Sequence, residues 1–270
     1  MFRWILVLLF LASPALSEDR RPSHCIALAQ APGLEYLHKA SFRDPVERHH
    51  VRISYIAHAS FLIQSDDGTS AITDFTGFFG NVAFLPDAVT MNHAHDTHWT
   101  AFPDPAIPHV LRGWDELGGI ADHHLDLGSM LIRNVPTDIR RFDGVEENGN
   151  SIFVFEIGGL CVAHLGHLHH EPNAAQYAAL GRMDVVMAAV DGGMSLDTPT
   201  MMRVLRKVKA RIVIPMHWFE GWTLNAFLTV MSDTYDVINT GESALEVSLR
   251  SLPARPTIHV LAPRYLREDR

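Results

Sequence analysis

The order of β-type and helical patterns along the chain constrains its fold more than any other feature of the sequence. Short runs rich in β-branched and aromatic residues begin at residue 51, and a turn at Asp66-Asp67-Gly68 joins two of them, which is a hairpin signal. From residue 173 onward, helical and strand-like segments alternate. We expect strands at 51–56, 60–64, 70–73, 88–91, 130–135, 151–157, 160–163, 184–190, 211–215, 244–249 and 258–261, and helices at 173–181, 198–209 and 223–232. This order predicts an α/β fold in which helices pack on sheets.

The first 17 residues have the pattern of a secretory signal. Arg3 precedes an apolar run from Ile5 to Leu11, and the small residues Ala15 and Ser17 follow it. The run is shorter than the roughly 20 apolar residues that cross a bilayer, so an uncleaved membrane anchor is the weaker alternative. No linker divides the rest of the chain. We therefore expect a signal peptide at 1–17, a single domain at 18–270, and a periplasmic or secreted protein with no membrane span after cleavage.

The charge balance argues against one class of partner. The chain has 22 Lys and Arg against 31 Asp and Glu, a formal net charge of −9. Nucleic-acid binding depends on a basic surface that neutralises phosphates. We therefore expect a small-molecule substrate and no nucleic-acid partner.

The sequence contains two cysteines, Cys25 and Cys161. Export permits a disulfide between them. However, Cys161 lies in the apolar run Leu160-Cys-Val-Ala163, which favours a buried, unpaired side chain. We expect no disulfide, and neither cysteine has the C-x-x-C spacing of a zinc or redox site.

Histidines are concentrated in two short segments. Of the 17 in the chain, three lie at 93–98 and four at 164–170. His93 and His95 project to the same side of an extended segment, and a turn into a helix brings His98 towards them. Imidazole is a preferred ligand of Zn²⁺, so this segment predicts a metal site, with a polar surface turn as the alternative.

The second segment also follows a predicted strand. Gly166 allows a sharp turn that directs His167 inwards, and we expect His167 to be a metal ligand. His164, with its neighbours His169 and His170, either supports the ligands or lies at the surface. A third strand ends at His217. Strand ends from three separate units predict convergence on one rim.

Five sequence motifs together resemble one family. They are Ile56-Ala-His58-Ala-Ser-Phe-Leu-Ile63, Ile72-Thr-Asp74, His93-Ala-His95-Asp96-Thr97-His98, Leu165-Gly166-His167 and Pro215-Met-His217-Trp218. Over residues 51–220 the chain resembles the metallo-β-lactamase-fold hydrolases, in the branch of ascorbate-phosphate lactonase and N-acyl-phosphatidylethanolamine phospholipase D. The resemblance implies a four-layer αββα sandwich with metal ions between the sheets at one edge.

The chain departs from the family motif at two aspartates. Thr97 stands where the motif has the aspartate before its last histidine, and His167 stands where the family has a bridging aspartate. Asp138 is the nearest substitute for a third histidine. A bridging carboxylate offsets the charge of two ions, so its replacement by imidazole disfavours the second ion. We expect one tight metal at His93, His95 and either His217 or His167, with a second ion weak or absent.

These observations predict an exported metal-dependent hydrolase that cleaves an ester, lactone or phosphodiester with a metal-activated water. Zinc is the expected metal, as one or two ions, with manganese or iron as alternatives, and His98 belongs to the same ligand set. Asp96 or Asp138 would orient the water or act as base. Four residues would support the ligands from behind: His58, Asp74, His164 and Asp191. The alternative is a non-catalytic exported protein that binds metal or another ligand and derives from such a hydrolase.

Overall fold

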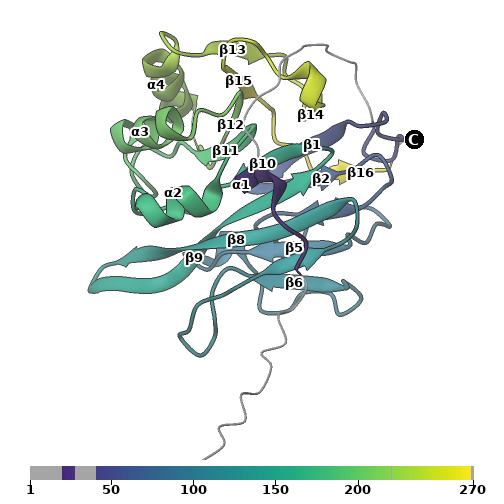
Figure 1. Ribbon diagram of the computed structural model, residues 1–270, viewed down its shortest axis with the longest axis horizontal. Helices are drawn as coiled ribbons and strands as arrows, with labels where there is room; N and C mark the ends of the chain where they lie inside the picture. The colour runs from purple at the N-terminus through teal and green to yellow at the C-terminus, as the bar shows by residue number, and fades with distance from the viewer. Residues whose placement is uncertain (1–19, 28–40, 220, 269–270) are drawn as a thin grey trace, which may run out of the picture.

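Two β-sheets form the body of the protein in the computed structural model, which describes residues 20–27, 41–219 and 221–268 (Figure 1). The predicted signal peptide at 1–17 lies outside these residues. The six-stranded sheet has the order β14 (Ala244–Val247), β1 (Val51–Ala57), β2 (Ser60–Gln64), β3 (Ser70–Ile72), β5 (Ala88–Met91) and β6 (His109–Arg112). The eight-stranded sheet has the order β13 (Asp236–Asn239), β15 (Thr257–Val260), β12 (Ile212–Met216), β11 (Val185–Ala189), β10 (Leu160–His164), β9 (Gly144–Ile157), β8 (Met130–Arg141) and β7 (His124–Asp126). A separate short pair joins β16 (Leu266–Arg267) to β4 (Gly80–Asn81).

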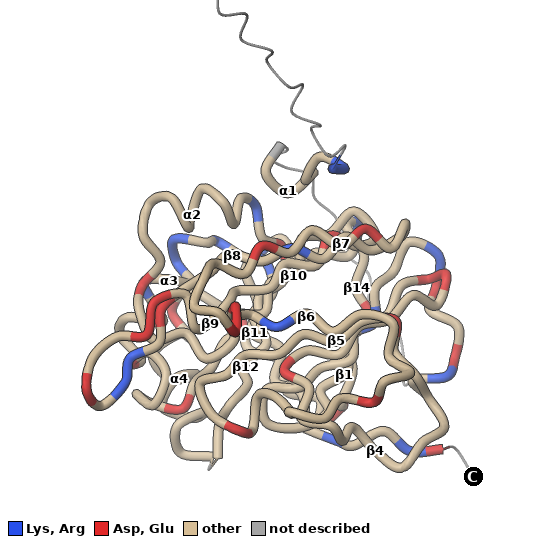
Figure 2. Tube along the Cα trace, turned by 90° about the horizontal axis from the view of Figure 1, so that it is seen from below, with Lys and Arg blue, Asp and Glu red and all other residues tan. Residues whose placement is uncertain are grey.

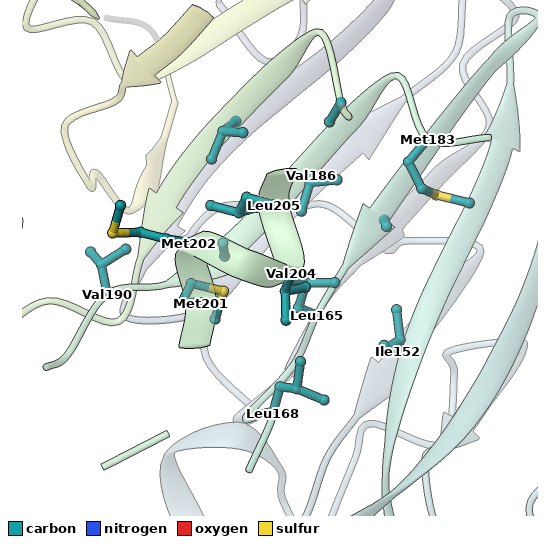
Figure 3. Close-up of a cluster of buried hydrophobic side chains, with 14 of the residues drawn as sticks. Ile152, Leu165, Leu168, Met183, Val186, Val190, Met201, Met202, Val204 and Leu205 are labelled. Atoms are coloured by element: carbon teal, nitrogen blue, oxygen red, sulfur yellow. The ribbon is translucent and has the colours of Figure 1, made fainter. Parts of the chain in front are cut away.

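Three helices cover the outer face of the eight-stranded sheet: α2 (Ala174–Leu180), α3 (Thr198–Val208) and α4 (Gly221–Met231). Each helix packs an apolar face against the sheet. Figure 3 shows Met201, Val204 and Leu205 of α3 among sheet residues that include Ile152 and Val186. The start of α3 is fixed by Asp197, whose side chain accepts a hydrogen bond from the backbone of Thr200. A fourth helix, α1 (His24–Ala27), is a single turn near α2.

A second apolar layer lies between the two sheets and contains the fully buried rings of Phe61, Phe153 and Phe155. A third covers the outer face of the six-stranded sheet, where Leu62 and Val89 are buried. None of the four α-helices in the described ranges contributes a buried residue to this third layer, which is covered by loops instead. The predicted α/β class is therefore confirmed, with loops in place of one helical layer among these residues.

Neighbouring strands of both sheets deliver side chains to one rim. The strands β10, β11 and β12 are parallel to one another, as are β3 and β5. Because parallel strands end at the same edge of a sheet, the residues that follow them lie close together. The chain leaves β5 into 92–98, β10 into 165–170, β11 into Asp191 and β12 into His217.

Cys25 of α1 and Cys161 of β10 form a disulfide, with Cα atoms 5.7 Å apart. Our expectation of an unpaired Cys161 was wrong. The apolar run around Cys161 does predict its burial, but its partner comes from 136 residues away in sequence. The backbone of His24 also donates to the buried Glu156 of β9, so the segment around α1 is held at two points.

The hairpin of β8 and β9 is longer than the sequence pattern predicts. We expected strands at 130–135 and 151–157, whereas pairing continues to Arg141 and Gly144. The extension contains polar residues on both strands and a register shift between Thr137 and Ile139. No helix in the described part of the chain is long and apolar enough to cross a membrane.

Candidate metal centre

Four histidines from three separate segments of the chain meet at this rim. His58, His95, His98 and His217 each offer one nitrogen, and these nitrogens all lie within 4.8 Å of one another. We call these four residues the histidine cluster. His98 and His217 are fully buried, whereas His58 and His95 are partly exposed, so the cluster has a closed side and an open side.

Backbone geometry directs two of these rings to the same point. His58 follows β1 with a φ of 48°, and His217 follows β12 with a φ of 58°. This left-handed conformation is uncommon for a residue with a side chain and often marks a functional site. The backbone N–H of His217 donates to the carbonyl of His58 over 2.9 Å, and their ring centroids are 4.0 Å apart. This contact joins the ends of the two sheets.

The closed side has a symmetrical arrangement of two imidazoles and two carboxylates. The Nε2 atoms of His98 and His217 face each other at 3.2 Å. Behind them, Nδ1 of His98 is 2.5 Å from Oδ2 of Asp74, and Nδ1 of His217 is 2.9 Å from Oδ2 of Asp191. A carboxylate beside Nδ1 favours a proton on that nitrogen and the lone pair on Nε2, which is the usual arrangement behind a metal-bound histidine. Two facing lone pairs have no favourable partner in each other, but both can bind one cation.

Electrostatics keep the rings of His98 and His58 neutral. Burial, His217 and His95 lower the pKa of His98 well below its ordinary value. Burial and the neighbouring His217 lower the pKa of His58 to about 3. Metal ligation requires neutral imidazole, and both of these rings are in that state at neutral pH.

The two carboxylates are themselves fixed by hydrogen bonds. Asp74 accepts from the side chain of Asn92 over 3.0 Å, and burial raises its pKa to about 6. Asp191 accepts from the backbone of Gly193, Met194 and Ser195. Burial opposes ionisation of Asp191, but hydrogen bonds from His217, Ser195 and Gly193 outweigh it and hold its pKa below the ordinary value. Both groups therefore carry negative charge behind the cluster at neutral pH.

His167 lies against this cluster, as its position after β10 predicts. Gly166 turns the chain with a φ of 60°, at a point where a Cβ would lie 2.5 Å from Asn92. The ring of His167 is 4.7 Å from those of His95 and His217, and its Nδ1 lies 2.6 Å from Nε2 of His169. Sequence reasoning left the role of His169 open, and the structure places it directly behind His167.

The donor set fits a divalent metal ion. The Nε2 atoms of His58, His95 and His167 are buried and have no hydrogen-bond partner among the described residues. Such unpaired buried atoms are rare because each costs the free energy of its lost hydration. A single cation could bind the unpaired nitrogens of His58 and His95 and the facing nitrogens of His98 and His217. Neutral imidazole is a strong ligand for zinc and similar metals.

His164 has a supporting position and no free nitrogen. Its Nε2 lies 2.7 Å from the carbonyl oxygen of Ala59, and its Nδ1 accepts from the backbone N–H of Gly166. The fully buried ring thus joins the end of β10 to the turn between β1 and β2.

The structure does not bring His93 into the cluster, although we expected it to be a ligand. Its Nε2 is 3.3 Å from Glu146, its Nδ1 is 3.3 Å from the carbonyl oxygen of Gly149, and its ring is 4.5 Å from that of Trp114. Glu146 and Gly149 belong to β9, so the long hairpin holds His93 away from the rim. Of the expected ligand set of His93, His95 and either His217 or His167, the histidine cluster contains His95 and His217.

The two aspartates that we expected to act on water are also placed elsewhere. Asp96 is exposed at the start of the 3-10 turn Asp96–His98. Asp138 accepts from the backbone of Asn148 over 2.9 Å at the register shift of the β8–β9 hairpin, which assigns it a structural role. Within the described residues, the carboxylates that reach the cluster are Asp74 and Asp191.

Sequence reasoning placed His58 behind the ligands, whereas the structure places it among them. The available signal was its position at the end of a strand, which it shares with His217. The expected supporting roles of Asp74 and Asp191 agree with their contacts to His98 and His217.

Two packed sheets with a buried, carboxylate-supported histidine cluster at their strand ends define a class of α/β proteins with a metal site. A family model described as the beta-lactamase superfamily domain matches residues 52–217, and the chain belongs to this superfamily, with the metallo-β-lactamase fold.

Two solved structures show the same fold. One, described as a candidate Zn-dependent hydrolase of the metallo-β-lactamase superfamily from Thermotoga maritima, is 23% identical, and the match covers 78% of this chain and 98% of that one with a TM-score of 0.54. Another, described as a candidate metal-dependent hydrolase from Parabacteroides distasonis, is 16% identical, with coverages of 68% and 89% and a TM-score of 0.53. No curated protein matches the sequence.

Proposed function

We propose that this protein is a metal-dependent hydrolase that binds one zinc ion through His58, His95, His98 and His217. The observation that carries the proposal is the 3.2 Å approach of the Nε2 atoms of His98 and His217, each with a carboxylate behind its Nδ1. An all-imidazole shell suits zinc better than magnesium or calcium, which prefer oxygen ligands. Manganese and iron are the alternative metals.

The proposed site divides the chemistry between the ion and the chain. Bound zinc supplies a water of lowered pKa and polarises a substrate oxygen. Asp74 and Asp191 hold two rings in one tautomer and supply negative charge close to the ion. His58 and His95 lie on the open side, where a substrate can approach. Because Asp96 and Asp138 lie elsewhere, the proposal uses no separate carboxylate as base.

An exposed aromatic ring beside the open side supports a substrate with an apolar part. The ring of Phe219 is 5.2 Å from the rings of His58 and His217, and 58% of Phe219 is exposed. Met194, in the loop that holds Asp191, and Trp222, at the start of α4, are also exposed. We propose an ester, lactone or phosphodiester of a small molecule as the substrate. Figure 2 shows Lys and Arg in short, separated stretches of the trace, which agrees with the absence of a nucleic-acid partner in this proposal.

A non-catalytic binding function is the second candidate. Four histidines complete the tetrahedral shell that is typical of structural zinc sites, whereas catalytic sites keep a position open for water or substrate. In a hydrolase, His58 or His95 on the open side would have to leave the ion, or the ion would have to accept a fifth ligand. In a binding protein, all four would remain bound.

Metal content and hydrolysis together test these functions. The chain without residues 1–17 is purified, its metals are measured by element and number, and a phosphodiester, a lactone and an ester are offered as substrates. Turnover with one zinc per chain supports the hydrolase. One tightly bound zinc with no turnover supports the binding function, and an absence of bound metal contradicts both.

We also propose that the protein is exported, in agreement with the signal-like pattern at 1–17. The disulfide between Cys25 and Cys161 supports this, because disulfides persist in oxidising compartments. Replacing both cysteines by alanine should lower the free energy of unfolding by about 2–5 kcal/mol, measured by denaturant titration. Recovery of the protein from the cytoplasmic fraction, with residues 1–17 still attached and free thiols at both positions, would contradict the proposal.

A further inference from the structure

His167 lies at the rim beside the histidine cluster but is not one of its four residues. It is 2% exposed, and its Nε2 has no hydrogen-bond partner among the described residues. Its ring faces those of His95, His98 and His217, at centroid distances of 4.7, 5.1 and 4.7 Å. The chemical role of that Nε2 depends on whether it carries a proton or a lone pair.

The backbone N–H of Arg140, behind His169, determines where the proton lies. The backbone N–H of Arg140 donates to Nδ1 of His169 over 2.8 Å. A backbone N–H can only donate, so Nδ1 of His169 must be the unprotonated nitrogen of that ring. A neutral imidazole carries one proton, which therefore lies on Nε2 of His169.

The proton on His169 in turn determines which nitrogen of His167 is protonated. Nε2 of His169 lies 2.6 Å from Nδ1 of His167, so the proton on His169 is donated to Nδ1 of His167. Since Nδ1 of His167 accepts, the proton of this imidazole must be on its Nε2. The reverse direction would leave His169 with two accepting nitrogens and no proton, which is an anion that neutral water does not produce. Rotating the ring of His169 by 180° would replace both nitrogens with carbons and lose both bonds.

We propose that His167 is a hydrogen-bond donor to a negatively charged oxygen at the metal centre, fixed in this role by Arg140 and His169. The proposal rests on the metal site of the proposed function. A protonated Nε2 has no lone pair for a metal ion. It can instead donate to a carboxylate, phosphate or similar oxyanion bound at the ion, or to the negative charge that develops on a substrate oxygen during hydrolysis.

The proposal explains why a single ion suits this site. A second ion would use the other group of potential ligands, His167, Asp191 and His217. His167 presents a proton there, and the two oxygens of Asp191 already accept from the backbone N–H groups of Gly193 and Ser195. His167, which donates a hydrogen bond to an anion, therefore occupies the place that a bridging carboxylate would otherwise take.

Nitrogen NMR of the imidazole rings tests the tautomer directly. In ¹⁵N-histidine-labelled protein, we expect Nε2 of His167 to be protonated and Nδ1 to be unprotonated, both in metal-free and in zinc-loaded protein. The assignment uses the disappearance of signals in His167→Asn. Protonation on Nδ1 of His167, or loss of the Nε2 proton when zinc binds, would overturn the proposal.

Metal content separates the proposal from the proposed function. We expect His167→Ala to retain one zinc per chain with an affinity close to that of the unchanged protein. Loss of zinc in this variant, with zinc still bound by the unchanged protein, would show that His167 is a ligand and would overturn the inference alone. Absence of zinc from the unchanged protein would overturn the proposed function, and the NMR measurement on metal-free protein would still test the tautomer.

Anion binding tests the role of the donor. Inorganic phosphate is titrated into zinc-loaded protein by calorimetry, and we expect His167→Ala to bind it about 10- to 100-fold more weakly, as for a lost hydrogen bond to a charged group. His169→Ala should weaken phosphate binding less and should give a mixture of His167 tautomers. His169→Gln should restore both properties, because an amide can accept from Arg140 and donate to His167. Equal phosphate affinity in the unchanged protein and His167→Ala would contradict the proposal.

Discussion

The two sides of the histidine cluster differ in what lies behind each ring. His98 and His217 are buried and have Asp74 and Asp191 behind them. His58 has no carboxylate at its other nitrogen in the contacts of the described chain, and Nδ1 of His95 lies 2.8 Å from the hydroxyl of Thr97. A carboxylate orients a ring and makes it more basic, so the closed side should supply most of the metal affinity. The open side should adjust coordination and admit substrate.

The largest expected effect is loss of the metal when a closed-side ligand is removed. His217→Ala or His98→Ala should prevent zinc retention through purification, because each leaves a buried carboxylate without its partner as well as removing a ligand. His58→Ala and His95→Ala should retain zinc with weakened affinity. Zinc content after dialysis against a chelator measures the difference. Equal losses for all four variants would refute the distinction between the sides.

A smaller effect is expected when the carboxylates are changed and the ligands are kept. Asp74→Asn and Asp191→Asn should weaken zinc binding by about 10- to 100-fold, the usual cost of losing a hydrogen-bonded carboxylate behind a histidine ligand. Competition with a chromogenic chelator measures this affinity. Thr97→Ala is the matched control, since it removes the hydroxyl beside His95 on the open side and should change affinity by less than about threefold.

A histidine buried outside the cluster should respond to pH rather than to metal. His259 on β15 is 5% exposed, and burial lowers its pKa to about 4. Between about pH 6.5 and 4 the unfolded chain therefore binds a proton that the folded chain excludes, so the free energy of unfolding falls as pH falls through this window. Over this window His259 changes the free energy of unfolding by about 3 kcal/mol.

Unfolding of metal-free protein at pH 7 and pH 4.5 measures this contribution. His259→Leu should lose less stability between the two pH values than the unchanged protein does. A pH dependence that is unchanged in His259→Leu would show that this residue titrates normally in the folded state.

The sequence predicted the parts of the molecule in which local pattern and tertiary structure agree. Apolar strands with clear turns, such as 60–64 and 70–73, were found where expected, and the superfamily resemblance is confirmed by the match to residues 52–217. The particular branch of the superfamily stays a prediction. The convergence of His95, His98 and His217 agrees with the expectation that the strand ends of separate units meet at one rim.

The direction of each ring was not predictable from spacing. His93 and His95 are two residues apart, yet one contacts the hairpin and the other joins the cluster. The decisive elements are the polar extension of β8 and β9, which carries no apolar alternation, and the left-handed backbone at His58, which no motif specifies. Both depend on contacts between residues that are distant in sequence. The disulfide between Cys25 and Cys161 was weighed as an alternative and disfavoured, because the apolar pattern around Cys161 predicts burial but not which distant residue it contacts.

The smallest expected effect on zinc affinity comes from replacing His93. This variant tests directly whether His93 is a metal ligand, as its position in the motif predicts. His93→Ala should leave zinc affinity unchanged within about twofold, because the ring contacts Glu146, Gly149 and Trp114 rather than the cluster. It should lower the free energy of unfolding by about 1 kcal/mol, since it removes packing and hydrogen bonds that attach the β8–β9 hairpin to the rim. Chelator competition and denaturant titration on the same preparation separate the two effects. Zinc loss comparable to that of His217→Ala would mean that His93 is a ligand, and the proposed ligand set, which excludes it, would then be wrong.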